Sequence, residues 1–433
     1  MKLLAVVVVL GLAQAACESA TSEKIQSWKG TEKGPEKIET ALRSANSPAG
    51  LRAEAAAALV DIGRPEKVDE IMASIPAGER WEILKTLMDI YIKAMSSPQL
   101  PKVRDARDGL FSMRQYAPPE EQKRIDQVLL ASIEKDLFDG RLSGGRHSLE
   151  KMLPAIGTAS GPMLVRLLGD PKAPYRGLAE LLVKVGDEGS RDRGGRALIG
   201  RVSPGKAMAN DMWMSLGMIG GPTATEFLLD KMQKGTPEDA VAAARALQQS
   251  RFPAALLVAL KTAGDPRASN DLRDEAFGVV EKIGGPEAQK GLVHIIAEDK
   301  NEKVRYRAHE AALAVGKADA IVPALQAFSP KLSFKREDVV DFLVKDISKI
   351  GASAKPQVLA ALASPSALAR MTAVLALEAP VSAALTGHMG GPEDVAALLK
   401  LADDKGTLKG FPSGVTVGAE SRRVGAVLES KGK

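Results

Sequence analysis

The chain of 433 residues has only one cysteine, Cys17, and only 4% of its residues are aromatic. A single cysteine cannot form a framework of internal disulfides, so a packed core must stabilise the protein. The scarcity of aromatic residues disfavours a β-sandwich or β-barrel, because strands are enriched in aromatic and β-branched side chains. The apolar residues make up 45% of the chain and are mainly Ala, Leu, Val and Ile, which favours closely packed helices.

The sequence also has little excess charge. Its 59 Lys and Arg residues and 54 Asp and Glu residues give a net charge of +5, and the two signs alternate along almost the whole chain. A nucleic-acid-binding protein concentrates positive charge on one face, so we expect no nucleic-acid partner. Beyond residue 12, no apolar run approaches the about 20 residues that a membrane-spanning helix needs. We therefore expect that the body of the protein does not span a bilayer.

The first 16 residues have the pattern of an export signal. Lys2 is followed by an apolar run over residues 3–12 and by small residues up to Ala16. A basic start, a short apolar core and a small-residue exit are the three parts of a secretory signal peptide. We expect residues 1–16 to be removed and the mature protein to be exported.

Cys17 stands directly after this signal and resembles the acylated cysteine of bacterial lipoproteins. That family prefers Leu three residues before the cysteine, where this chain has Gln14. The resemblance implies a lipid such as palmitate on Cys17 and, because Glu18 replaces the Asp that retains lipoproteins at the inner membrane, an outer-membrane location. The alternative is cleavage after Ala15 or Ala16, which would give a soluble periplasmic protein with a free thiol.

The rest of the chain divides by composition and pattern. Residues 17–35 are rich in Ser, Thr, Glu, Lys and Gly and are expected to form a flexible tether. Residues 36–145 are expected to be helical, with one clear repeat and then longer, divergent helices. A repeat array is expected over residues 146–405, and a C-terminal cap or tail over residues 406–433.

An apolar helical pattern that ends in Ile-Gly or Val-Gly recurs along the chain. We call the glycine of each such pair a mark. From the second mark onward, successive marks are 29, 34, 64, 32 and 35 residues apart, and the helical pattern also breaks at residues 251–253, inside the longest interval. A glycine ends a helix in a left-handed conformation, and a proline soon afterwards suits the next helix. A period of about 32 residues predicts an all-α solenoid of helix pairs. The marks are Gly63, Gly157, Gly186, Gly220, Gly284, Gly316 and Gly351.

Three of these marks follow an aliphatic-Arg pair by eleven residues, at Arg52, Arg273 and Arg305. This spacing resembles HEAT repeats, in particular the short bacterial kind named after phycobilisome lyases. Val340 stands at the arginine position before Gly351, so not every unit keeps the pair. The resemblance implies stacked helix pairs whose free surface binds other proteins.

The sequence offers little for catalysis or metal binding. His309-Glu310 begins the motif of zinc proteases, but Leu313 stands where the second histidine is needed, so we expect no metal. Ser148 and Lys151 match the Ser-x-x-Lys of penicillin-recognising enzymes without its companion motifs, and Ser148 is interpreted as a helix cap. We predict no catalytic residue and no cofactor.

One cluster of basic residues is a candidate binding site. Its members are Arg191, Arg193, Arg196, Arg201 and Lys206, and Asp192 is the only acidic residue among them. The cluster could bind an anion or an acidic partner at an edge of the solenoid. The alternative is a solvated helix with its connections.

Taken together, these patterns predict a non-enzymatic lipoprotein scaffold that binds other proteins, of unspecified identity, in the bacterial cell envelope. One alternative is an enzyme or enzyme accessory, because the lyases that give the repeat its name attach tetrapyrroles. The other is a soluble periplasmic scaffold without a lipid.

Overall fold

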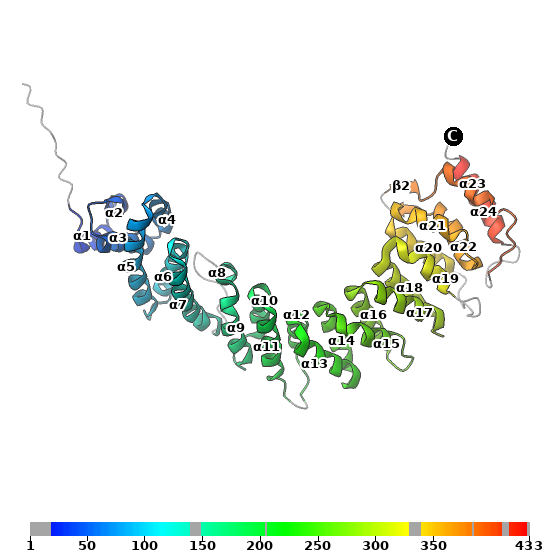
Figure 1. Ribbon diagram of the computed structural model, residues 1–433, viewed down its shortest axis with the longest axis horizontal. Coiled ribbons are helices and arrows are strands. Elements are labelled where there is room, and N and C mark those ends of the chain that lie inside the picture. The colour runs from blue at the N-terminus through cyan, green and yellow to red at the C-terminus, as the bar shows by residue number, and fades with distance from the viewer. Residues whose placement is uncertain are drawn as a thin grey trace, which may run out of the picture. The chain divides into compact units, whose positions relative to one another are not determined.

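A computed structural model describes residues 19–138, 149–203, 206–328, 339–382, 385–408 and 415–430. The predicted signal peptide and Cys17 lie outside the described residues, as does Ser148. The chain forms two compact units, residues 1–187 and 188–433, and within each unit the helices follow one another in chain order (Figure 1). None of the described helices is both long and apolar enough to cross a bilayer.

The first unit consists of helices joined by short connections. Helix α3 packs against α2 and α5, α7 packs against α6 and α9, and α10 packs against α8 and α9. Two 3-10 turns, η1 (Arg114–Tyr116) and η2 (Gly157–Ser160), extend α6 and α8. The helices are α1 (Ser22–Trp28), α2 (Gly34–Arg43), α3 (Ala49–Asp61), α4 (Pro65–Ser74), α5 (Ala77–Met95), α6 (Leu100–Met113), α7 (Pro119–Phe138), α8 (Leu149–Ile156), α9 (Gly161–Gly169) and α10 (Tyr175–Val185).

Helix α1 corrects the prediction of a flexible tether over residues 17–35. The hydroxyl of Thr21 accepts a hydrogen bond from the backbone N–H of Lys24 and caps the helix. Ile25 and Trp28, three residues apart and so on one helix face, are buried, and α1 packs against α2 and α3. The polar composition of this segment concealed the short apolar face.

The second unit contains fourteen α-helices in its described residues. They are α11 (Glu188–Ile199), α12 (Asn210–Ile219), α13 (Gly221–Lys234), α14 (Pro237–Ser250), α15 (Leu256–Ala263), α16 (Asn270–Ile283), α17 (Pro286–Glu298), α18 (Glu302–Gly316), α19 (Ile321–Ala327), α20 (Val339–Ile350), α21 (Lys355–Ala361), α22 (Ala367–Glu378), α23 (Val395–Leu399) and α24 (Val417–Ser430). Short 3-10 turns lead into several of them: η3 (Pro253–Ala255), η4 (Lys317–Ala320), η5 (Ala352–Ala354) and η6 (Pro392–Asp394).

Successive helices of this unit alternate between two layers. In the layer that we call layer A, helices α12, α14, α16, α18, α20 and α22 pack in succession. In layer B, α11 packs against α13, and α15, α17, α19 and α21 pack in succession. The fold is thus an all-α solenoid of helix pairs, as the sequence predicted. One short hairpin was not predicted: β1 (Pro380–Ser382) pairs antiparallel with β2 (Leu385–His388).

The boundary between the two units lies after Asp187, and not near residue 146, where the sequence analysis placed the start of the array. Helix α9 packs against α7, and α10 packs against α8 and α9, so the three helices α8 to α10 belong with the long helices before them. The repeat pattern of the sequence continues across this boundary. It therefore could not show where one compact unit ends and the next begins.

The glycine marks end helices in two different ways. Five of the seven have positive φ: Gly63, Gly157, Gly220, Gly284 and Gly351. The prediction of a left-handed glycine is wrong at Gly186 and Gly316, where φ is −77° and −96°. There the glycine is needed for space, because a Cβ at Gly186 would lie 2.6 Å from the carbonyl oxygen of Leu182. The predicted break at residues 251–253 is confirmed, since Arg251 ends α14 with φ 49° and ψ 28°.

The C-terminal helix α24 packs against α22 and α23. It buries Val417, Val424 and Leu428. The guanidinium of Arg370 in α22 holds the segment before α24 through Asp404, at 2.6 and 3.2 Å. The last helix of the described chain is therefore fixed to the array by both apolar and ionic contacts.

Candidate functional site

The predicted aliphatic-Arg pairs place buried arginines between consecutive helix pairs. Arg52 Nε donates a hydrogen bond to the carbonyl of Leu42 at 2.9 Å, and Arg273 Nε donates to the carbonyl of Ala263 at 2.8 Å. Each carbonyl belongs to the last turn of the helix before, where backbone acceptors lack a helical partner. The pair that revealed the repeat in the sequence is therefore a joint between repeats.

Asp299 connects two of these joints. Its carboxylate lies 2.5 Å from Arg273 Nη2, and its backbone carbonyl accepts a hydrogen bond from Arg305 Nη1 at 2.9 Å. The side chains of all three residues are at least nine-tenths buried. These arginines are thus part of the scaffold and are not accessible to a partner.

Charges on the outer side of layer A are neutralised by neighbouring helices. Arg245 on α14 pairs with Glu275 on α16 at 2.6 Å, and Arg307 on α18 pairs with Glu281 on α16 at 2.5 Å. These two arginines are therefore engaged in contacts between repeats.

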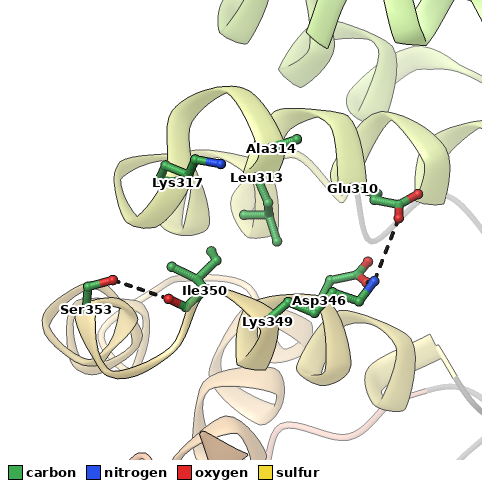
Figure 2. Close-up of a pocket in the computed structure, with 8 residues that line it drawn as sticks. All are labelled: Glu310, Leu313, Ala314, Lys317, Asp346, Lys349, Ile350 and Ser353. Atoms are coloured by element: carbon green, nitrogen blue, oxygen red, sulfur yellow. Dashed lines mark hydrogen bonds and ion pairs between the residues drawn. The ribbon is translucent and has the colours of Figure 1, made fainter. Parts of the chain in front are cut away.

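A groove of about 440 Å³ lies between α18 and α20 in layer A (Figure 2). Leu313 and Ile350 project into it from opposite sides, as Figure 2 shows. At one end Lys349 Nζ lies 2.8 Å from Asp346 and 3.7 Å from Glu310. The charged groups at this end therefore satisfy one another, and only a small apolar floor remains.

His309 lies beneath this groove and is fully buried. Its Nδ1 is 3.6 Å from Asp346 Oδ2, and its ring lies 5.8 Å from that of Phe328. Burial alone would raise the pKa of Asp346, but the proximity of His309 and Lys349 outweighs it and lowers that pKa below its ordinary value. The buried ring of His309 cannot reach a substrate. In the part of the chain that the structure describes, no three His, Cys, Asp or Glu side chains gather as metal ligands.

The predicted basic cluster is divided between two sides of α11. Arg193 and Arg196 are exposed, whereas Arg191 is half-buried. Arg191 and Arg193 lie on different sides of the helix because they are two residues apart, which corresponds to a rotation of about 200°. Arg196 pairs with Asp192 at 3.0 Å. A hydrogen bond from the backbone N–H of Thr223, at 2.9 Å, is the main cause of the lowered pKa of Asp192.

The other two members of the cluster follow α11. Arg201 is half-buried, whereas Lys206 is exposed and lines a hollow described below. The structure therefore does not bring the five basic residues together into one site. Of the five, Lys206 is the one that lines that hollow.

Layer B contains an apolar hollow of about 760 Å³ between α13 and α15, bordered by α11. Its polar lining includes Glu226 and Asp230. Its apolar lining comprises Ile199, Pro222, Phe227, Leu229, Phe252, Ala254 and Val258. Partly exposed phenylalanines beside a cavity are typical of the anchor positions of protein interfaces.

Helix α15, beside the apolar hollow, is packed with its small residues inward. It buries Ala259 and Ala263, while Leu257 is 77% exposed and Val258 is half-buried. The next helix of layer B has the usual arrangement, because α17 buries its leucine and isoleucines and exposes Lys290. Exposed aliphatic side chains beside an apolar hollow are expected where another molecule covers the surface.

A second hollow, which we call the basic hollow, has a volume of about 670 Å³ and lies on the other side of α13. It shares the lining residues Ile199 and Phe227 with the apolar hollow, so the two hollows are neighbours. Its ionisable lining comprises Lys206, Lys231, Lys234 and Asp239. Lys231 Nζ lies 5.6 Å from the centre of the Phe227 ring, within the range of a cation–π interaction.

The sequence analysis did not identify Phe227, Phe252 or Leu257. A signal was present in α15, where residues 256–260 are all aliphatic. One face of an eight-residue surface helix cannot bury five consecutive side chains, so some of them must be exposed. Phe227 and Phe252 carried no such signal, because a single phenylalanine in a helical repeat is usually a core residue.

Comparison with known proteins agrees with the repeat assignment over part of the chain. A family model described as HEAT repeats matches residues 225–314, which run from α13 to α18 and include Arg273 and Arg305. No curated protein matches the sequence.

Several solved structures resemble the chain at low sequence identity. Kap121p bound to Pho4p is 14% identical, with a TM-score of 0.44, over 94% of this chain and 45% of that chain. Kap121p bound to the SUMO protease Ulp1p is 14% identical, with a TM-score of 0.38, over 89% and 39%. UNC-45 from Drosophila melanogaster is 12% identical, with a TM-score of 0.25, over 95% and 62%. The chain thus spans less than half the length of Kap121p. We conclude that this is an all-α solenoid that contains HEAT repeats over residues 225–314.

Proposed function

We propose that the protein is a non-enzymatic scaffold that binds other proteins through layer B around α13 and α15. The observation that carries this proposal is the packing of α15, which covers its alanines and leaves Leu257 77% exposed. Full burial of a leucine side chain stabilises a protein by about 2 kcal/mol. Most of the Leu257 side chain stays in water when the chain folds. Its burial by a partner would therefore add most of this free energy to binding.

The neighbouring side chains support the same surface. The apolar hollow offers Phe227 and Phe252 as partly exposed anchors, and its lining includes Val258, the residue after Leu257 on α15. In layer A, by contrast, Arg245 and Arg307 are paired with acids on the next helix. Protein interfaces combine an apolar centre with a polar rim, and in this unit layer B provides both.

We further propose that a lipid on Cys17 anchors this scaffold to the bacterial cell envelope, at the outer membrane. The proposal rests on the export pattern of residues 1–16, on the single cysteine directly after it and on Glu18. A soluble periplasmic scaffold, released by cleavage after Ala15 or Ala16, is the alternative. In either case the binding surface faces an aqueous compartment outside the cytoplasm.

Comparative recovery of crosslinked partners tests the binding surface. Tagged parent protein and the double variant Phe252→Ser/Leu257→Lys would be expressed in the native cells, crosslinked and quantified by mass spectrometry. Proteins recovered with the parent should be depleted about tenfold or more with the variant, because both anchors are lost. The matched control is Lys282→Glu on layer A, which should recover the same proteins as the parent. Equal recovery with the double variant would contradict the proposal.

A further inference from the structure

The two hollows of layer B differ in charge although they share the Phe227 side chain. The apolar hollow has no cationic residue in its lining, and its acids are Glu226 and Asp230. The basic hollow has three lysines and one acid, Asp239. A segment that crosses α13 therefore passes from an apolar environment to a positively charged one.

Two of the three lysines are available to a partner. Lys234 Nζ is 2.7 Å from Asp230, which neutralises it. Lys206 and Lys231 form no ion pair with any of the described residues. Asp239 lies in the first turn of α14, where the helix dipole already stabilises a carboxylate. The basic hollow thus retains positive charge that the chain itself does not balance.

The position of Lys231 also favours a carboxylate. The Phe227 ring lies 5.6 Å from its ammonium group and covers one side of it, so this lysine is placed at the junction of the two hollows. A carboxylate that reaches Lys231 would form a charge-assisted hydrogen bond in a partly desolvated setting. A basic group at the same place would meet two unpaired lysines.

We propose that this surface binds a segment of a partner protein in which carboxylates lie within a few residues of large apolar side chains. The apolar side chains occupy the hollow between α13 and α15, against Phe227 and Phe252. The carboxylates pair with Lys206 and Lys231 in the basic hollow. This inference rests on the proposed function, because it specifies the chemistry of the segment that the scaffold binds.

Binding of synthetic peptides to the full chain, measured by fluorescence anisotropy, tests this chemistry. The probes are four families of twelve-residue peptides that contain Leu and Phe followed by Asp and Glu, by Asn and Gln, by Lys, or by Ser alone. We expect binders in the acidic family whose affinity is about tenfold or more above that of their amide analogues and falls as salt is added. Phe252→Ser/Leu257→Lys should abolish binding.

Charge reversal identifies the lysines. Lys231→Glu should reduce affinity for acidic peptides by about tenfold and increase affinity for the Lys family. Lys290→Glu on α17 is the matched control and should change neither. Equal binding of acidic and amide peptides would overturn the proposed chemistry while leaving the binding surface intact. Binding of the acidic family that survives Phe252→Ser/Leu257→Lys would place the site elsewhere and contradict both proposals.

Discussion

A buried arginine stabilises a protein only when its desolvated guanidinium finds well-placed acceptors. Arg273 meets this condition by contacting the carbonyl of Ala263 on one side and the carboxylate of Asp299 on the other. Ala263 ends α15, in the preceding helix pair, and Asp299 directly follows α17, the helix that pairs with α16, so one side chain connects two consecutive helix pairs. This explains why an arginine recurs at a position that is otherwise part of the core.

Arg273→Met tests this role. The substitution keeps the apolar stem but leaves the Asp299 carboxylate buried and unpaired, which should cost about 3 kcal/mol. Hydrogen exchange of the amides in α15 to α18 would report the local loss of stability. Arg267→Met is the control, since the Arg267 side chain is 87% exposed and its surface pair with Asp265 should contribute little to stability. Equal effects of the two substitutions would contradict the account.

Asp404 provides a second residue-level test, through pH. A hydrogen bond from Arg370 is the main cause of its lowered pKa. A carboxyl group whose pKa is lower in the folded state stabilises the protein above its unfolded pKa of about 4, and this contribution is lost as pH falls through the folded value.

Asp404→Asn should therefore destabilise the attachment of α24 at pH 7, by about 2 kcal/mol, and the difference from the parent should shrink below about pH 4. Hydrogen exchange of α24 at pH 7, together with thermal unfolding followed by circular dichroism between pH 3 and 7, would measure it. A difference that is constant over this range would show that the ionised form of Asp404 is not what holds the helix.

At the scale of elements, helices α15 and α17 have similar compositions but bury different kinds of side chain. Both belong to layer B and both are rich in aliphatic residues. In α17 the large residues Leu292 and Ile296 are fully buried, whereas in α15 Ala259 and Ala263 are. Helix α17 therefore contributes its large side chains to the core, whereas α15 leaves Leu257 at the surface.

Leu257→Lys separates folding from binding at this element. Because the side chain is 77% exposed, the substitution should change the melting temperature by no more than about 1 °C. Leu292→Ala, at a fully buried position, should cost about 2–5 kcal/mol and lower the melting temperature clearly. A similar fall for both variants would mean that Leu257 belongs to the core.

The sequence predicted the helix pairs because the pattern that marks them has a local physical cause. An apolar stripe, a helix-ending glycine such as Gly284 and a buried arginine such as Arg273 each constrain nearby residues. The hollows could not be predicted in this way, because Phe227 and Phe252 approach each other only when α13 and α15 are placed in three dimensions. Ile25 and Trp28 in α1 show the same limit, since two apolar residues in a polar segment carry too little periodicity.

At the scale of the whole molecule, a solenoid stabilises itself through contacts between neighbours and leaves its outer surfaces free. Anchoring such a scaffold at one end would hold partners near a membrane. A single acyl chain gives only marginal, reversible membrane affinity, and stable anchoring takes a second chain or a second membrane-binding signal.

Labelling with a radioactive fatty acid tests the anchor directly. The parent chain should incorporate label and fractionate with membranes, and Cys17→Ala should do neither, because Cys17 is the only thiol in the sequence. Export of an unlabelled parent chain would favour the soluble periplasmic form. That outcome would leave the binding surface on layer B unaffected.

The most direct test of the central claim is site-specific photo-crosslinking in intact cells. A photoreactive amino acid would replace either Leu257 on layer B or Lys282 on layer A, both of which are exposed. The account predicts discrete crosslinked products from position 257, lost when Phe252→Ser is added, and none of these products from position 282. Products that are the same from both positions, or that persist with Phe252→Ser, would contradict it.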